Sequence, residues 1–316
     1  MDDKRDTFYE NLISGMLGEQ RRNRVWGYVF KFCFLLYLFF TSISFMFLTG
    51  VGNTDVQDKA HIGVVDLLGP IDRSTSINST TTVKALNSAF EAENSIAIIL
   101  NADSPGGSPV QSDIINREIN RLKNEYPDKP VIAVVGDMCA SGCYYIISAA
   151  DKILVNPTSL LGSIGVKMSG FGYTDIMNKV GVERRTISVG DHKTMMDPFS
   201  PEDEVATDHL KQRVLIKTHE EFVRVVTEGR GTKIDSSTNT ELFNGLVWAG
   251  REAIEIGLAD AIGSLHDVAR EYTDGEGIHN YTIQRRSIKD LFFGSAVELA
   301  KEIATPATHP KLRMEL

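Results

Sequence analysis

The 316-residue sequence has few of the residues that dominate disordered or fibrous chains. It contains 10 prolines and 26 glycines, and 42% of its residues are hydrophobic, which excludes collagen-like and low-complexity classes and indicates a folded core. Three cysteines are too few for the disulfide framework of a small secreted domain. The formal net charge is −9, with no run dense in lysine or arginine. Because phosphate neutralisation needs a basic face, nucleic acid is not an expected partner.

Long hydrophobic runs are also scarce, with one exception near the N-terminus. Phe32–Leu48 is a stretch without a charge, at the short end of what crosses a hydrocarbon core as a helix. Lys31 lengthens the usable span to Val25, because a lysine side chain reaches back to the headgroups. No A-x-A cleavage site follows, so we expect a retained transmembrane anchor over residues 25–48 rather than a cleaved signal peptide.

The charges beside this segment predict its orientation. One basic residue, Lys59, occurs in the stretch that follows it, whereas four precede it: Arg21, Arg22, Arg24 and Lys31. The positive-inside rule therefore places residues 1–24 in the cytoplasm. In a bacterium the anchor would lie in the inner membrane, and the rest of the chain, which carries most of the acidic side chains, would lie in the periplasm or on the outer face.

The exported part divides into a linker at residues 49–60, a folded domain at 61–284 and a charged tail at 285–316, to which we assign no role. Within the domain, short β-branched runs alternate with helical patterns. This order is typical of βαβ units, so an α/β fold with a mainly parallel sheet is expected. The strands are predicted at 62–67, 96–100, 131–135 and 153–155, and the helices at 83–92, 110–124 and 142–150.

The second half of the domain is predicted to be more helical. A strand is expected over 183–189, followed by a long helix that begins with Ser200 as N-cap and Pro201 at its first position and ends at residues 229–231. A last helix over 250–256 is expected to close at Gly257, with a strand-like segment over 258–262.

Ser141 follows a buried strand and a tight turn, directly before the helix expected from Gly142. Free N–H groups at a helix N-terminus favour negative charge, which suits an oxygen nucleophile and the oxyanion formed beside it. The simpler interpretation is a helix cap. The glycine pair Gly106-Gly107 follows the neighbouring strand, and it either forms an ordinary turn or lets its amides approach a ligand closely. Both loops leave the carboxyl edge of the sheet, where α/β folds bind ligands.

A nucleophilic serine needs a base, and none of the seven histidines lies in an evident Ser-His-Asp context. Lys193 is a candidate if it is buried enough to be neutral, because lowering a lysine pKa from about 10.4 to about 7.4 costs about 4 kcal/mol. A solvated loop lysine is the alternative interpretation. His192 is the rival base.

Five motifs together resemble one family, the signal peptide peptidase A family of membrane-bound serine proteases. They are NADSPGG (101–107), MCASGCYYIISAADKI (138–153), GSIGV (162–166), GDHKTMMDPFSP (190–201) and GLVWAGREAIEIGLADAIG (245–263). The resemblance covers roughly residues 60–265. It implies the ββα superhelix shared by Clp protease and crotonase, a Ser/Lys dyad, and assembly into a homo-oligomer.

Carried over motif by motif, the resemblance implies a role for each of five residues. Ser141 is the nucleophile and Lys193 the general base, while Ser163 hydrogen-bonds and orients that lysine. The amides of Gly107 and Gly142 form the oxyanion hole. No metal or other cofactor is implied, since neither clustered ligands nor a P-loop occurs.

Cys139 and Cys143 lie on either side of Ser141 and depart from the family pattern. A disulfide between them is conceivable in an oxidising compartment, but one cysteine precedes the helix and the other lies inside it. Buried apolar packing is therefore the favoured role. A catalytic thiol is disfavoured, because no base is evident beside either cysteine.

The sequence thus predicts a membrane-anchored serine endopeptidase that hydrolyses hydrophobic peptides, such as cleaved signal peptides, through an acyl-enzyme. Two alternatives stay open: a peptidase that processes one specific membrane or phage protein, and a non-enzymatic membrane scaffold with a peptidase fold. A crotonase-like acyl-CoA enzyme is disfavoured, because an exported chain has no coenzyme A supply.

Overall fold

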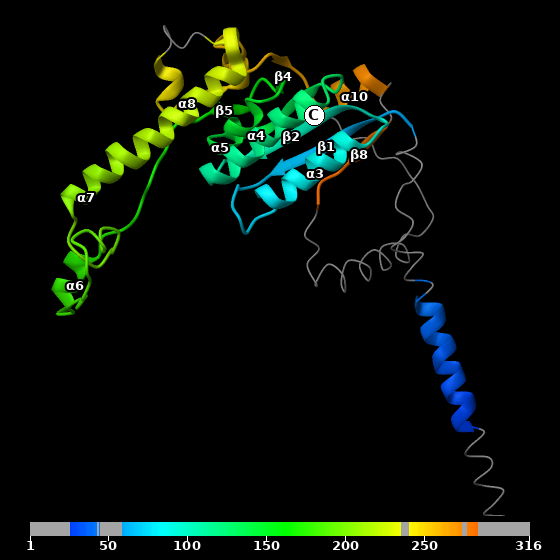
Figure 1. The fold of residues 1–316 in the computed structure, drawn as a ribbon, viewed down its shortest axis with the longest axis horizontal. Coiled ribbons are helices and arrows are strands. Elements are labelled where there is room, and N and C mark those ends of the chain that lie inside the picture. The colour runs from blue at the N-terminus through cyan, green and yellow to red at the C-terminus, as the bar shows by residue number, and fades with distance from the viewer. Residues whose placement is uncertain (1–25, 43, 45–58, 235–239, 274–276, 284–316) are drawn as a thin grey trace, which may run out of the picture. The chain divides into compact units, whose positions relative to one another are not determined.

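The computed structural model describes residues 26–42, 44, 59–234, 240–273 and 277–283 (Figure 1). The chain divides into two compact units, Met1–Asp55 and Val56–Leu316. In the first unit, residues 26–42 are helical and their side chains are exposed. Within the described ranges, no helix has both the length and the apolar character that a membrane span requires.

Several of the predicted segments extend beyond the described residues. The predicted anchor includes residues 25, 43 and 45–48, which are not described, so it stays a prediction. The predicted cytoplasmic segment 1–24, most of the linker and the tail 285–316 also lie outside the described residues.

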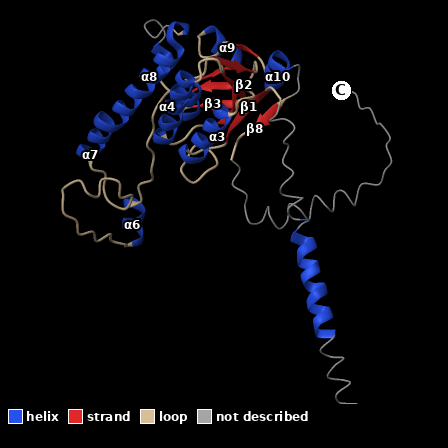
Figure 2. Cartoon of the chain, turned by 45° about the vertical axis from the view of Figure 1, so that its right-hand side comes forward, coloured by secondary structure: helices blue, strands red, loops and turns tan. Residues whose placement is uncertain are grey.

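The second unit has a mixed α/β fold built around one sheet, as Figure 2 shows. The strands are β1 (His61–Leu68), β2 (Ser95–Ser104), β3 (Val131–Ala140), β4 (Lys152–Val155), β5 (Leu160–Gly162), β6 (Val247–Ala249), β7 (Ala261–Ile262) and β8 (Ile278–Asn280). The helices are α3 (Ser79–Glu91), α4 (Pro109–Glu125), α5 (Gly142–Ile147), α6 (Thr174–Val180), α7 (Glu204–His209), α8 (Ile216–Arg230), α9 (Gly250–Glu255) and α10 (Leu265–Thr273). The four predicted strands and three predicted helices of the first half are confirmed.

The sheet is mainly parallel, with the strand order β6-β5-β3-β2-β1-β8. Strand β3 lies at its centre and has two partners on one side, since its first half pairs with β4 and its second half with β5. Strand β4 in turn pairs with β7. The pair β5 and β6 is antiparallel, while the other pairs are parallel.

Alternating side chains of each central strand pack into two cores. On β3, Val131, Ala133 and Val135 join the larger cluster, which also contains buried side chains of α3, α4, α5 and α8. Ile132 and Val134 point to the opposite face and pack in a smaller cluster with residues of α10. This burial on both faces explains why the strand sequences are continuous apolar runs.

The long helix differs from its prediction at its start. Asp203, not Ser200, is the N-cap of α7, and its carboxylate accepts a hydrogen bond from the Ala206 amide at 3.0 Å. A π-helical segment, Leu210–Leu215, joins α7 to α8, which ends at Arg230 before Gly231 as predicted. Ser200 instead donates its hydroxyl to Asp197 at 3.2 Å.

The strand predicted over residues 183–189 is wrong. This segment has no regular secondary structure, and Ile187 and Val189 are fully exposed. A β-branched run forms a strand only where another strand supplies hydrogen-bonding partners, and none of the described strands pairs with it. The last helix and the strand after it are confirmed as α9 and β7.

Candidate active site

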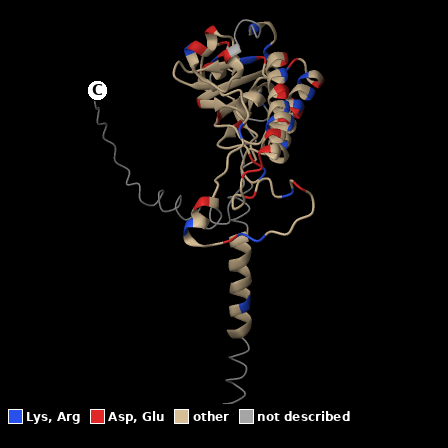
Figure 3. Ribbon diagram, turned by 90° about the vertical axis from the view of Figure 1, so that its left-hand side faces the viewer, with Lys and Arg blue, Asp and Glu red and all other residues tan. Residues whose placement is uncertain are grey.

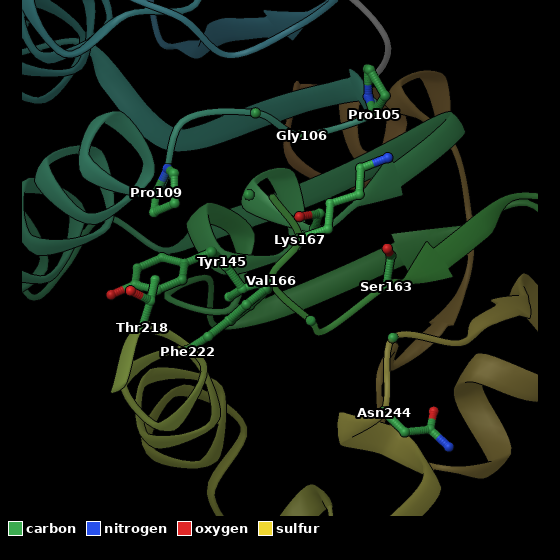
Figure 4. A pocket seen from close by; sticks show the side chains of 15 residues that line it. Pro105, Gly106, Pro109, Tyr145, Ser163, Val166, Lys167, Thr218, Phe222 and Asn244 are labelled. Atoms are coloured by element: carbon green, nitrogen blue, oxygen red, sulfur yellow. The ribbon is translucent and has the colours of Figure 1, made fainter. Parts of the chain in front are cut away.

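Four of the five predicted site residues line one cavity of about 580 Å³. They are Gly107, Ser141, Gly142 and Ser163. They follow the ends of β2, β3 and β5 and therefore lie together at the carboxyl edge of the sheet, where parallel α/β folds bind ligands. Figure 4 shows this cavity from close by.

Ser141 lies between β3 and α5 in a backbone conformation that few residues other than glycine adopt. Its φ is 54° and its ψ is −122°. Its amide donates a hydrogen bond to the Gly162 carbonyl at 2.8 Å, and its carbonyl accepts one from the Tyr145 amide at 3.0 Å. The side chain makes no capping hydrogen bond to α5. The helix-cap interpretation of Ser141 therefore fails, and a strained backbone at such a position is typical of functional sites.

The glycine pair lies directly against this turn. The Ile71 amide donates to the Gly106 carbonyl at 2.9 Å, and the Ser108 amide donates to the Ile71 carbonyl at 2.8 Å. In this parallel bridge the Gly107 N–H faces away from Ile71, and among the described residues no acceptor is found for it. A methyl group placed on Gly142 would lie 3.2 Å from the Gly107 nitrogen.

The Gly142 amide adds a second donor at the same place. Gly142 is the first residue of α5, and the first N–H groups of a helix have no acceptor within the helix. The amides of Gly107 and Gly142 thus belong to residues that line the same cavity as Ser141. This is the arrangement that stabilises the negative oxygen of a tetrahedral intermediate.

Ser163 shares the unusual conformation of Ser141. Its φ is 52°, and in the described part of the chain these two serines are the only residues other than glycine with positive φ. The Ser163 amide donates to the Leu246 carbonyl at 2.6 Å, which fixes the turn after β5. Its half-buried side chain lines the cavity, while its predicted role of orienting the base stays a prediction.

Cys139 and Cys143 form a disulfide bond, with their Cα atoms 5.1 Å apart. The disulfide that the sequence disfavoured is therefore present, while the predicted burial of both side chains is confirmed. The turn at Ser141 reverses the chain enough to bring the last residues of β3 and the first turn of α5 together, which spacing alone does not indicate. Both side chains are buried, so the bond also belongs to the core.

Lys193 does not line the cavity. Its side chain is exposed, and it lies in a turn closed by the bond from its own amide to the Gly190 carbonyl at 3.1 Å. The neighbouring His192 ring contacts the Asp203 carboxylate at 2.5 Å, and this hydrogen bond raises the pKa of His192. The single chain therefore brings neither Lys193 nor the rival base His192 to Ser141.

A different lysine, Lys167, does line the cavity, and the sequence analysis missed it. Figure 4 shows its side chain extending across the pocket, with the ammonium nitrogen toward Pro105. Lys167 directly follows the GSIGV motif, and this position is the signal that could have identified it. Across the described residues, no cluster of three or more histidine, cysteine or acidic side chains is placed to hold a metal ion.

Comparison with known proteins places this site in a family. The model of peptidase family S49 matches residues 123–279. The chain belongs to peptidase family S49. The match includes Ser141, Gly142, Ser163 and Lys193, and it confirms the predicted membership of the signal peptide peptidase A family of serine peptidases.

Several individual proteins are similar to this S49 chain. It is 37% identical over 231 residues to the Na(+)/H(+) antiporter NhaA of Brucella abortus, which is 72% of the chain and 31% of that protein. It is 32% identical over 223 residues to the chloroplastic serine protease SPPA of Arabidopsis thaliana, 69% of the chain and 32% of the relative. It is 28% identical over 279 residues to protease 4 of Haemophilus influenzae, which is 81% of the chain and 44% of that protein. The chain therefore matches less than half the length of each.

Proposed function

We propose that this S49 member is a membrane-anchored serine endopeptidase that hydrolyses hydrophobic peptides, such as signal peptides left in the membrane after cleavage. The observation that carries the proposal is Ser141. Its hydroxyl makes no capping bond, and it lies on a strained turn beside the amides of Gly107 and Gly142. The fold proposed for the whole domain is the superhelix shared by Clp protease and crotonase.

The chemistry assigned to these residues is acyl transfer. The Ser141 hydroxyl oxygen attacks the scissile carbonyl carbon as the base accepts its proton, and the carbonyl oxygen becomes an oxyanion held by the two amides. The intermediate collapses when the protonated base gives its proton to the leaving amine. Water then attacks the acyl-enzyme with the same base assisting, which releases the second peptide fragment and restores Ser141.

Lys193 is proposed as that base, supplied by a second copy of the chain. A lysine can accept a proton near neutral pH only where burial disfavours its charged form, and Lys193 is exposed in the single chain. The segment that carries it has several exposed apolar side chains: Phe171, Ile176, Val180, Val182, Ile187, Val189 and Met196. Assembly would cover this surface, and within a homo-oligomer Ser163 is proposed to orient the lysine.

The substrate class is supported by the lining of the cavity. Tyr145, Val166 and Phe222 group on one side of it, as Figure 4 shows. An extended peptide beside the Gly106-Gly107 loop would place its side chains alternately toward and away from this apolar wall. Apolar side chains near the scissile bond are the expected preference.

The location follows from the sequence. Residues 25–48 are proposed to anchor the chain in the inner membrane, with the N-terminus in the cytoplasm and the peptidase unit outside it. No nucleic-acid partner is proposed. On α8, Arg224 contacts Glu221 and Glu228, and Figure 3 shows the two signs of charge interleaved along the helices rather than gathered in a basic face.

The test is hydrolysis of fluorogenic apolar peptides by the purified full chain, together with labelling by a fluorophosphonate probe. Ser141→Ala is expected to abolish both readouts. Lys193→Ala is expected to lower kcat/KM by at least about a hundredfold. His192→Ala is the matched control, and it is expected to lose no more than a few-fold, because it removes only the contact with Asp203. If wild type neither hydrolyses the peptides nor reacts with the probe, the result contradicts the peptidase proposal and favours a non-enzymatic membrane scaffold.

Mixing two inactive variants tests where the lysine comes from. When equal amounts of Ser141→Ala and Lys193→Ala chains assemble at random, about a quarter of the sites pair an intact serine with an intact lysine from another copy, provided that the dyad is shared between copies. Activity near a quarter of wild type is therefore expected. No recovery on mixing would contradict the shared dyad and favour a lysine from the same chain.

A further inference from the structure

The cavity beside Ser141 has two chemically different sides. Tyr145, Val166 and Phe222 form the apolar side, while the Lys167 ammonium lies toward Pro105 on the other (Figure 4). Of the fifteen lining residues, Lys167 is the one with a charged side chain. A peptide bound near Ser141 therefore meets a positive charge on one side of the pocket.

The Lys167 ammonium has no partner among the described residues. No ion pair or side-chain hydrogen bond of the described chain includes it. Other lysines with a part-buried or charged neighbourhood are paired, as shown by Lys123 with Asp151, Lys217 with Glu220 and Lys233 with Asp260. The three donors of the Lys167 ammonium are therefore free for a ligand.

The cavity also differs in charge from the protein as a whole. The protein is acidic overall, with a net charge of −9, yet the residues that line the cavity include neither aspartate nor glutamate. A cation with no acidic side chain beside it in the cavity gives a local positive potential, and its complement is an anion of the substrate. In a peptide that anion is a carboxylate.

We infer that Lys167 is a specificity-determining residue that selects peptides carrying a carboxylate on the Pro105 side of the scissile bond. The carboxylate comes from a glutamate or aspartate side chain or from the C-terminus of the peptide. This inference rests on the proposed peptidase function and narrows its substrate class to peptides that combine an apolar stretch with a nearby negative charge.

A role as general base is the competing interpretation of the same lysine. A base must be neutral before it accepts a proton, and a lysine becomes neutral through desolvation or a nearby cation. In the single chain the Lys167 side chain is exposed and no other cationic side chain lines the cavity, so neither cause is present there, while the proposed assembly supplies Lys193 as the base. Lys167 already belongs to the chain that carries Ser141 and has no partner among the described residues, so carboxylate recognition is the role that fits it.

The experiment compares matched peptides on the full-length protein. The parent substrate is a neutral, apolar fluorogenic peptide. In each test peptide a glutamate replaces one residue of the parent, and a matched peptide, its twin, carries glutamine at the same position. Every peptide is made in two forms, with a free C-terminal carboxylate and with a C-terminal amide. Wild type is expected to cleave the charged twin about fivefold faster in kcat/KM at one position, and high salt should reduce the ratio. Faster cleavage of the glutamate peptide than of its glutamine twin would identify a side-chain carboxylate as the group that Lys167 binds. Faster cleavage of the free acid than of the amide would identify the C-terminal carboxylate.

Charge variants connect this ratio to Lys167. Lys167→Gln is expected to bring the ratio to about one, and Lys167→Glu to reverse it in favour of a lysine-containing twin. Lys84→Gln, which removes an exposed charge from α3, is the matched control and keeps the wild-type ratio. The inference is overturned if wild type shows no preference, if Lys167→Gln retains it, or if Lys167→Gln abolishes cleavage of both twins, since that last result assigns the lysine to the chemistry.

Failure of the inference and failure of the proposed function give different results. Cleavage that depends on Ser141 but ignores peptide charge overturns the role of Lys167 alone. Absence of both cleavage and fluorophosphonate labelling in wild type overturns the peptidase assignment, and the role of Lys167 falls with it.

Discussion

The disulfide between Cys139 and Cys143 spans Ser141, the residue with a φ of 54° at the centre of the site. The bond joins the end of β3 to the first turn of α5, and Ser141 is the middle residue of the loop that it closes. A backbone conformation of this kind costs about 1–3 kcal/mol and persists only where its surroundings enforce it. The disulfide is a covalent part of those surroundings.

Loss of this disulfide should destabilise the protein and lower the reactivity of Ser141. Closing so short a loop contributes about 2 kcal/mol, so wild type refolded under reductant should unfold at a lower temperature than wild type refolded under oxidising conditions. Fluorophosphonate labelling should slow in parallel. The double variant Cys139→Ala/Cys143→Ala retains Cys33 and is the control, because reductant should not change its stability. Equal labelling of oxidised and reduced wild type would contradict the link between the bond and the site.

The contact between Gly106 and the Ser141 turn makes a second prediction. A methyl group on Gly106 would lie 2.5 Å from the Ala140 carbonyl oxygen and 2.9 Å from the Ser141 Cβ. Gly106→Ala should therefore displace Ser141 and, if Ser141 is the nucleophile as proposed, lower kcat/KM by at least about a hundredfold, which is the scale of a lost oxyanion contact. The φ of Gly106 is +91°.

Gly69→Ala is the matched control for this substitution. Its φ is +90°, but no atom lies within 4 Å of the added methyl group. Both variants acquire the same backbone strain, and Gly106→Ala alone acquires the clash. Circular dichroism checks that both fold. Equal loss of activity in the two variants would show that strain, rather than displacement of Ser141, is responsible.

Much of the second unit, Val56–Leu316, follows from the sequence because its central strands are buried on both faces. Continuous β-branched runs such as Val131–Val135 favour strands in the interior of a parallel sheet, and the loops after such strands meet at one edge. Gly107, Ser141 and Ser163 therefore converge as predicted. The sheet order and the pairing of β3 with both β4 and β5 depend on contacts between distant segments, which local patterns do not contain.

The predictions that failed concern residues whose environment depends on tertiary structure. Ile187 and Val189 belong to a run with strand propensity but have no neighbouring strand in the described chain. The bond between Cys139 and Cys143 depends on how sharply the chain turns at Ser141. Lys167 is one surface lysine among many until the fold places it at the cavity.

Arg230 and Asp260 give a prediction about stability. The Arg230 side chain is fully buried, and it donates two hydrogen bonds of 3.0 Å to the Asp260 carboxylate and two more to the Gly257 carbonyl. Removing the charge of one partner leaves the other uncompensated in the core. Asp260→Asn should therefore lower the free energy of unfolding by about 2–4 kcal/mol in denaturant titrations. Glu220→Gln, at an exposed ion pair with Lys217, is the control and should change it by less than about 0.5 kcal/mol.

The same pair has a defined pH dependence. Burial favours a raised pKa for Asp260, but the hydrogen bonds from Arg230, Lys233 and the Ile153 amide outweigh it, so the pKa lies below the usual 3.8. Because folding lowers the pKa of Asp260, its charged form stabilises the folded state at every pH above the ordinary carboxyl pKa. This stabilisation is lost as the pH falls through the lowered pKa of the folded state. The difference between wild type and Asp260→Asn should therefore be constant near neutral pH and shrink on acidification below about pH 4. A difference that does not change with pH would contradict a charged Asp260.

The last prediction concerns His192 and Asp203, which connect the turn carrying Lys193 to the start of α7. Their hydrogen bond raises the pKa of His192 above 6.5 and lowers that of Asp203. Because the pKa of the histidine is raised on folding, the contact is fully present below about pH 6.5 and is lost as the pH rises through the raised value. Asp203→Asn removes the charge but keeps a good N-cap.

If this contact holds the Lys193 turn in place, Asp203→Asn should lower kcat/KM a few-fold at pH 6, and the two profiles should converge at alkaline pH, where His192 is neutral in both. NMR titration of the His192 ring checks the cause, because its pKa should fall toward 6.5 in the variant. The ring signal of His266 on α10 identifies a second histidine in the same spectra. A loss of activity that persists unchanged at alkaline pH would assign Asp203 a role other than pairing with His192, since the pair no longer exists under those conditions.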